Sequence, residues 1–258
     1  MANMRSVPAK PNGKPVSKST RCDALGNVIN NGILLALPRK ECAALLSKIE
    51  YVKVAVPFLL NEIAKEIDFG YFINSGLASV LSVMKDGKSV EVGLVGKEGF
   101  VGAPLIAGFR TSPTRVVMQI SGDAFRIRPK DLKIALRQQP SLDRLLQRAA
   151  QQLGLQSAQV AACNRLHGVE SRLARWLLMS QDRIGGQTVP LTQEFLSHML
   201  GTRRASVTVG AAALQRAGLI AYKRGELTVS NRHGLEQAAC ECYGILVRQA
   251  HVWKFEAD

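Results

Sequence analysis

The stretch VPLTQEFLSHMLGTRRASVTVGAAALQRAGLIAYKRGELTV, Val189–Val229, decides the fold of this chain. The spacing of its apolar residues predicts a helix over Leu191–Leu200, with Thr192 as N-cap. Gly201 breaks that helix, and a second helix is predicted over Arg203–Arg216. Two arginines in its first turn oppose the helix dipole, so stability alone does not explain them. Their placement is typical of a helix whose N-terminus enters the major groove of DNA.

A β-hairpin is predicted directly after the second helix. The short runs Gly218–Tyr222 and Leu227–Val229 flank a basic turn, Lys223–Glu226, that contains a glycine. The alternative interpretation is a plain helical hairpin beside a β-hairpin, with no role in DNA binding. The order of helix, glycine turn, basic helix and basic hairpin tip favours a winged helix-turn-helix.

The composition favours a polyanionic partner. The 258 residues include 34 Lys and Arg against 20 Asp and Glu, a formal net charge of +14. Nucleic acid is the first candidate, before an acidic membrane surface. Residues 1–29 are rich in Lys, Pro, Ser, Asn and Gly and are predicted to form a flexible basic arm. Because there is neither an apolar run of about 18 residues nor a signal-peptide core, we expect a cytoplasmic protein without membrane contact.

The cysteines predict reduced thiols. Cys22, Cys42, Cys163, Cys240 and Cys242 form an odd set without the paired C-x-x-C pattern of a zinc site. The Cys240-x-Cys242 pair has the alternative interpretation of a redox or metal pair. On a helix, these two side chains would face different sides. We therefore expect no metal site.

The predicted fold class is α+β. Residues 30–136 contain short strands separated by Gly, Asn and Asp turns, which is typical of an antiparallel β-roll. Residues 137–164 predict a long helix. Residues 165–258 predict a winged helix-turn-helix domain, and the helical pattern over 233–255 predicts that it ends in one amphipathic helix packed on that domain.

The predicted long helix carries one apolar seam, to which Leu146, Leu153 and Val160 belong at intervals of seven residues. Such a seam predicts contact between the long helices of a homodimer. The alternative is a helix that packs on its own domain. We favour the homodimer because a helix-turn-helix usually binds DNA as a two-fold dimer.

A β-roll, a long helix and a winged helix-turn-helix in this order resemble the Crp/Fnr (cyclic-AMP receptor and fumarate–nitrate regulator) family of bacterial transcription regulators. The motifs that carry the resemblance are Tyr71–Gly76, Gly96–Gly102 and Leu191–Val207. The chain is also similar to a subgroup that ends in Ala-Cys-Glu-Cys-Tyr, here Ala239–Tyr243. The resemblance implies a homodimer that binds a palindromic site in double-stranded DNA, and RNA polymerase as a partner if the regulator is an activator.

The resemblance also implies an effector pocket, in which the family holds the phosphate and ribose of a cyclic nucleotide with a Gly-Glu pair and an Arg-Ser pair. Gly102 matches the glycine, but Ala103 replaces the glutamate. Ser112-Pro113 stands where Arg-Ser is expected, and Thr114 and Arg115 complete the candidate pocket. We therefore do not expect cyclic AMP to bind by the usual contacts. No cofactor is evident, and the effector is unknown or absent.

The resemblance names Arg204 as the residue that reads a guanine, because it matches the first base-reading arginine of the family. Ala205 and Val209 replace the other two readers, so the operator is expected to differ. The other candidate DNA contacts are Thr192, Gln193, Arg203, Ser206, Thr208, Lys223 and Arg224.

Two other function classes stay open at this point. One alternative is a ligand-binding module whose basic helices contact a protein or membrane partner. An enzyme is not expected, because the sequence shows no Ser/His/Asp set, metal-ligand spacing or phosphate loop. We name no catalytic residue.

Overall fold

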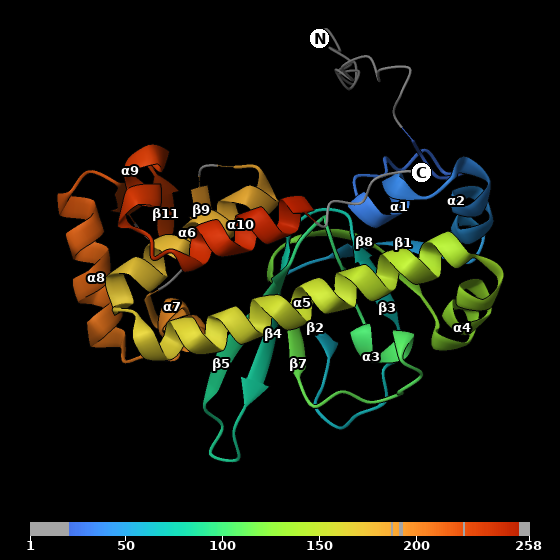
Figure 1. Cartoon of the computed structure of the whole chain (residues 1–258), viewed down its shortest axis with the longest axis horizontal. Helices are drawn as coiled ribbons and strands as arrows, with labels where there is room; N and C mark the ends of the chain where they lie inside the picture. The colour runs from blue at the N-terminus through green and yellow to red at the C-terminus, as the bar shows by residue number, and fades with distance from the viewer. Residues whose placement is uncertain (1–20, 187, 191–192, 224, 253–258) are drawn as a thin grey trace, which may run out of the picture.

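The computed structural model describes residues 21–186, 188–190, 193–223 and 225–252. Two four-stranded antiparallel sheets form a roll, a long helix crosses it, and a helical domain with a three-stranded sheet lies at one end (Figure 1). The predicted α+β class, with a β-roll, a long helix and a winged helix-turn-helix, is confirmed. Among the described residues, no helix has the length and apolar character that a membrane span requires.

The two sheets of the roll have the strand orders β1-β8-β3-β6 and β2-β7-β4-β5. The sequence pattern does not predict β2 and β6, because strands of four and two residues are too short to show alternation. The strands are β1 Glu50–Val54, β2 Phe58–Asn61, β3 Gly70–Ile73, β4 Leu77–Val83, β5 Ser89–Val95, β6 Phe100–Val101, β7 Arg115–Ile120 and β8 Gly122–Ile127.

Short helices flank the roll, and the chain packs on it from the first described residues. The guanidinium of Arg21 donates hydrogen bonds to the carbonyls of Leu34 and Leu37, at 3.2 and 2.9 Å, and Ile29 is buried. Residues 21–29 are therefore not part of a flexible arm, which corrects that part of the prediction. These helices are α1 Gly32–Ala36, α2 Arg39–Leu46, α3 Ala103–Ile106 and α4 Pro129–Gln138.

The long helix α5, Pro140–Leu166, is confirmed, but its apolar seam faces its own roll. Leu146 is fully buried in the core of the roll, and Leu153 packs on Gly93 of β5. Val160 is also buried within the chain. Leu146 and Val160 are therefore closed to a second subunit by the chain itself, and Leu153 is half-buried against the roll. Periodicity shows that a face is buried, but it does not show which partner covers it.

The C-terminal part holds the helix-turn-helix and the wing. Contrary to the prediction of one helix over 233–255, the chain forms two, because Ala239 has an extended backbone (ψ 150°) that ends the first. The second, α10, packs on α5 and α6. The elements are α6 Val169–Ile184, β9 Thr188–Pro190, α7 Gln193–Leu200, α8 Arg204–Arg216, β10 Ile220–Lys223, β11 Glu226–Val229, α9 Arg232–Ala238 and α10 Cys242–Val252.

Candidate nucleic-acid interface

Helix α8 packs one face on the domain and leaves the other in solvent. Val207, Ala211 and Leu214 are buried, as the spacing predicts. Gly210 lies over the start of α6, where an added Cβ would be 3.4 Å from Cα of Glu170, so the two helices cross closely. Val209 is 68% exposed on the opposite face. An apolar residue in this exposed position is available to touch a ligand surface.

The N-terminus of α8 presents positive charge to solvent. Arg203 is the N-cap and has an extended backbone, and Arg204 is the first helical residue; both side chains are exposed. Every residue of the first turn is described, and none is acidic. The N–H groups at a helix start favour anions. Together with two guanidinium groups, they make a surface that suits phosphate and guanine.

The remaining predicted contacts lie on α8, on the wing or outside the described residues. Ser206 is half-buried, and the exposed Thr208 donates a hydrogen bond from Oγ1 to the carbonyl of Arg204 at 3.0 Å. Lys223 is exposed at the end of β10, paired in register with Glu226 of β11. Thr192 and Arg224 lie outside the described residues, as does the side chain of Gln193.

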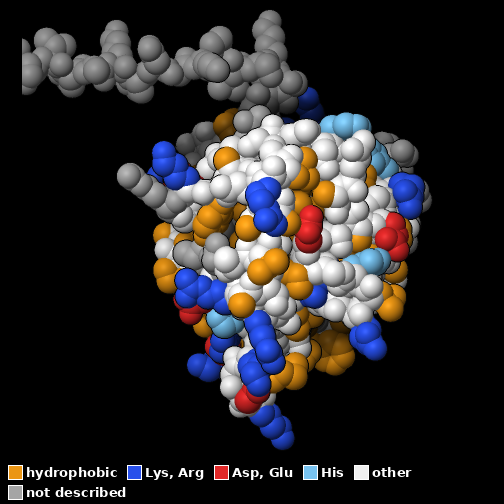
Figure 2. All heavy atoms as spheres, turned by 90° about the vertical axis from the view of Figure 1, so that its left-hand side faces the viewer, with side chains coloured by type: hydrophobic (Ala, Val, Ile, Leu, Met, Phe, Trp, Pro, Cys, Tyr) orange, Lys and Arg blue, Asp and Glu red, His pale blue; other side chains and the backbone are white. Residues whose placement is uncertain are grey.

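The wing is a three-stranded sheet in the order β10-β11-β9, of which the sequence predicts only two strands. Gly225 supplies the positive φ of +81° that the hairpin turn requires. Figure 2 looks onto this end of the molecule, and blue Lys and Arg side chains outnumber red Asp and Glu on it. The face is therefore electropositive although the charge is spread out.

The turn of the helix-turn-helix packs on the β4–β5 hairpin of the roll. At Gly201, which has a φ of +56°, an added Cβ would be 2.8 Å from Cγ2 of Val90. Arg172 of α6 donates to the carbonyl of Leu200 just before this turn. A cavity of about 460 Å³ between hairpin and turn is lined by Val90 and Arg203 among others. The roll thus touches the segment that positions the start of α8.

A buried carboxyl group joins the roll to the C-terminal helical domain. Glu91 on β5 accepts hydrogen bonds from Oγ of Ser79, from Nε2 of Gln119 at 3.1 Å, and from Nε1 of Trp176 on α6 at 2.8 Å. Gln119 Nε2 also lies 2.7 Å from the sulfur of Met199 on α7. Complete burial raises the pKa of Glu91 to about 7 despite these bonds. Glu91 was not predicted from the sequence; the available signal was a carboxylate inside an otherwise apolar strand.

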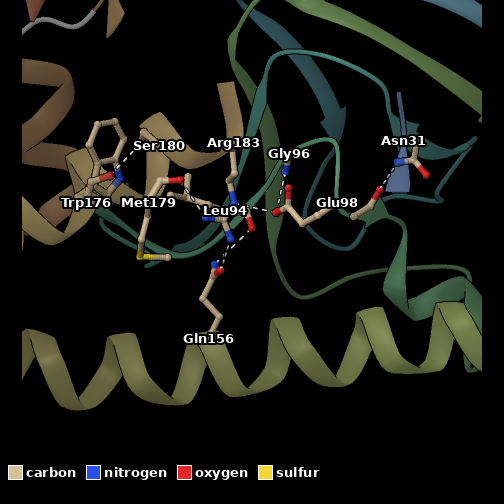
Figure 3. A network of polar contacts seen from close by, with 10 residues as sticks. Asn31, Leu94, Gly96, Glu98, Gln156, Trp176, Met179, Ser180 and Arg183 are labelled. Carbon is tan, nitrogen blue, oxygen red and sulfur yellow. Dashed lines mark hydrogen bonds and ion pairs between the residues drawn. The ribbon is translucent and has the colours of Figure 1, made fainter. Parts of the chain in front are cut away.

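Arg183 forms a second polar junction, drawn in Figure 3. From α6 its guanidinium donates to Oε1 of Glu98 in the roll at 2.7 Å and to Oε1 of Gln156 on α5 at 3.0 Å. Gln156 in turn donates to the carbonyl of Leu94 at 3.4 Å. These bonds connect the roll, the long helix and the C-terminal helical domain, so a shift of one of these three parts changes the contacts of the other two.

The predicted effector-pocket residues contact one another or neighbouring residues of the roll. Gly102 has a φ of +122°, and an added Cβ would be 3.1 Å from the ring of Phe100. Ala103 begins α3. The hydroxyls of Ser112 and Thr114 lie 3.0 Å apart and share a hydrogen bond.

The guanidinium of Arg115 donates two hydrogen bonds to the carboxylate of Glu62, from Nε to Oε1 and from Nη2 to Oε2, each 3.0 Å long. These bonds are the main cause of the lowered pKa of Glu62. The guanidinium of Arg115 must therefore release the carboxylate of Glu62 before it can bind a phosphate. The expectation that cyclic AMP does not bind by the usual contacts stays a prediction.

Several known proteins with a similar sequence pattern or fold are transcription regulators. Residues 171–238 match the family model of the Crp-like helix-turn-helix domain. No curated protein sequence matches the chain. Among solved structures, FixK2 from Bradyrhizobium japonicum matches with a TM-score of 0.64 at 13% identity, over 74% of this chain and 98% of that chain.

Two other regulators match over a similar span. The c-di-GMP-responsive global regulator CLP of Xanthomonas campestris gives a TM-score of 0.62 at 15% identity, over 74% of this chain and 99% of that chain. A CRP-family transcriptional regulator from Thermus thermophilus gives a TM-score of 0.57 at 21% identity, over 74% of this chain and 96% of that chain. At these identities the likeness establishes the fold.

Proposed function

The chain carries a Crp-like helix-turn-helix domain and has the fold of the Crp/Fnr transcription regulators, and we propose on this premise that it is a DNA-binding transcription regulator of that type. The observation that carries the proposal is helix α8, which is anchored on α6 by its apolar face and presents an exposed, arginine-bearing N-terminus. Such a helix fits the major groove, and the wing beside it fits the DNA backbone. Chromosomal DNA as the partner implies that the protein works in the cytoplasm.

Selection of bound sequences from a random pool of double-stranded DNA tests this function. The purified chain, without added ligand, is expected to enrich a palindrome, because two copies related by a two-fold axis read two half-sites. Non-specific retention with a steep salt dependence, but without an enriched sequence, would indicate that an effector is missing. No retention at low salt would contradict the proposal.

We propose Arg204 as the residue that reads a base. Arg204→Ala is expected to weaken binding to the selected operator by about 1–3 kcal/mol, roughly 5- to 150-fold, because a bidentate contact to guanine is lost. Binding to random DNA is expected to change less. The matched control is Arg216→Ala at the far end of the same helix. Electrophoretic mobility shifts on both DNAs measure the effect, and an equal loss on both would show a phosphate contact instead.

We propose that the homodimer forms through the outer face of α5. The exposed residues Gln151, Gly154, Ala158 and Ala161 follow one another at steps of three and four, so they lie along one face of the helix. Small side chains let two helices approach closely. This face replaces Leu146, Leu153 and Val160 as the proposed dimer contact, because Leu146 and Leu153 pack on the roll and Val160 is buried within the chain.

Ala158→Arg is expected to convert the dimer to a monomer, because a long charged side chain separates helices that small residues bring together. Light scattering after gel filtration measures the mass. Ala43→Arg, at an exposed alanine of α2, is the matched control and is expected to leave the dimer intact. If the Ala158→Arg protein is still a dimer, the interface does not lie on this face of α5.

The roll is proposed to regulate DNA binding through its contacts with the helix-turn-helix. Val90 touches the turn before α8, and Glu91 and Glu98 bind α6. A signal acts here only if it stabilises one arrangement of roll and DNA-binding domain over another. RNA polymerase is the further partner if the regulator is an activator.

A further inference from the structure

Four side chains with metal-binding atoms meet where the long helix ends. Cys163 and His167 are one turn apart at the C-terminal end of α5, and Cys240 and Cys242 flank the start of α10. Their three sulfur atoms and one ring nitrogen all lie within 4.8 Å of one another. Cys163, Cys240 and Cys242 are buried, and His167 is half-buried. The prediction that Cys240-x-Cys242 has no metal role assumed one helix, but the chain is not helical between α9 and α10, so both thiols face the same point.

The distances fit a tetrahedral ion. The sulfur atoms of Cys163 and Cys240 are 3.5 Å apart, and Cys242 Sγ is 3.6 Å from Nδ1 of His167. Zinc bonds of about 2.3 Å to sulfur and about 2.0–2.1 Å to nitrogen place ligands about 3.8 Å apart for two sulfurs and about 3.5 Å for sulfur and nitrogen. The widest pair needs to close by about 1 Å. A cluster with several irons between its ligands needs them farther apart.

The histidine is oriented as in a metal site. Nε2 of His167 lies 3.2 Å from the carboxylate of Glu241, which sits between the two cysteines in the sequence. An imidazole that donates from Nε2 has its free lone pair on Nδ1, the atom next to Cys242. A carboxylate behind a metal-binding histidine sets its tautomer and raises its basicity.

A buried positive charge lies near the thiols. Arg175 of α6 is 3% exposed, and its Nε has no hydrogen-bond partner among the described residues. Its positive charge favours the thiolate forms of Cys163 and Cys240. Three thiolates around a divalent ion carry one net negative charge, which a buried guanidinium offsets.

We propose that Cys163, His167, Cys240 and Cys242 bind one Zn²⁺ ion in a tetrahedral Cys₃His site. Zinc is the ion that thiolate and imidazole ligands in this geometry favour. The site joins the last turn of α5 to the segment between α9 and α10, next to the α5–α6 connection at Gly168. A bound ion therefore fixes the DNA-binding domain on the helix that carries it. This inference is independent of which DNA sequence the protein binds.

The test measures metal on the full chain, purified under reducing conditions and without a polyhistidine tag. Mass spectrometry of the metals is expected to find about one zinc per chain after gel filtration. Replacement of zinc by Co²⁺ is expected to give the visible bands of tetrahedral cobalt and the near-ultraviolet bands of thiolate bonds to cobalt. This readout on the unmodified chain needs no variant.

Variants assign the ligands. Cys240→Ser and His167→Ala are expected to lose the stoichiometric zinc and to alter the cobalt bands, whereas Cys42→Ser, at a buried cysteine of the roll, retains both. Glu241→Gln keeps all four ligands and is expected to weaken zinc binding by about 10- to 100-fold. Circular dichroism confirms that each variant is folded.

Three results would overturn the inference. One is a reduced, unmodified chain that holds no stoichiometric zinc and gives no thiolate-to-cobalt band. Another is iron with acid-labile sulfide in place of zinc. The third is a cobalt spectrum that Cys240→Ser and His167→Ala leave unchanged. If the first result is found, a disulfide between Cys163 and Cys240 that forms on oxidation, detected by peptide mass spectrometry, would assign a redox role to the same cluster instead.

Discussion

Trp176→Ala is expected to lower the free energy of unfolding by about 3–5 kcal/mol, because it leaves a cavity in place of the largest fully buried side chain among the described residues. Trp176 is 1% exposed in a core that leucines of the roll and helices of the DNA-binding domain share. Its ring packs edge-on against Phe195, with centroids 6.4 Å apart. Its Nε1–H also supplies one of the hydrogen bonds of Glu91. The substitution therefore removes packing and a polar bond at the same junction.

Urea denaturation followed by circular dichroism measures this change. Trp176→Phe retains a ring but loses the donor, so an intermediate loss is expected, about 1–3 kcal/mol for the polar group left without a partner. Leu25→Ala, at a side chain 87% exposed, is the control and is expected to change stability by less than about 0.5 kcal/mol. A Trp176→Ala protein within about 1 kcal/mol of the unmodified chain would show that roll and DNA-binding domain do not share this core in solution.

Glu91→Gln is expected to remove a pH dependence of stability worth about 3 kcal/mol. The native pKa of about 7 lies above the ordinary value of 4.5. Between these values the native carboxyl keeps a proton that the unfolded chain has released. The stabilisation by this group is complete below about pH 4.5 and is lost as the pH rises through 7. Glutamine does not titrate, so the variant gains stability relative to the unmodified chain over this window.

The measurement is the difference in unfolding free energy between the two proteins from pH 4.5 to 7.5, in which the other titrating groups cancel. Glutamine is expected to be tolerated at position 91, because Oε1 of Gln119 is buried without a hydrogen-bond partner among the described residues. When the side-chain amide of Gln119 turns over, this oxygen accepts a hydrogen bond from the new amide at position 91. Arg175 is the charged group that offsets part of the burial cost. Glu226→Gln, at an exposed wing residue, is the control. If the difference in unfolding free energy between Glu91→Gln and the unmodified chain does not change with pH, the carboxyl of Glu91 is hydrated in the native protein.

The winged helix-turn-helix was the part of the molecule most open to prediction. Its signals are local: apolar spacing in α7 and α8, a glycine at the turn, and basic residues at a helix start where stability disfavours them. The bounds of both helices agree with the prediction to within two residues. The Crp-like family match over residues 171–238 rests on the same stretch.

Predictions that depend on partners distant in the chain were less successful. Leu146 and Val160 showed a buried face, but the chain itself rather than a second subunit covers it, Leu146 in the core of the roll and Val160 elsewhere within the chain. Glu91 and Trp176 are 85 residues apart in the chain, and no local pattern pairs them. The same holds for Cys163 and Cys240, 77 residues apart.

The sequence by itself determined the long helix, the longer strands, the helix-turn-helix, their order and the chemistry at the start of α8, because helix periodicity, turn glycines and charge act over a few residues. The tertiary structure alone decided which face of α5 stays exposed, where the buried carboxyl of Glu91 finds its donors, and that three thiols and an imidazole converge. These outcomes depend on how the roll, the long helix and the DNA-binding domain pack. Packing brings together residues that lie far apart in the chain, and no local sequence pattern indicates that they meet.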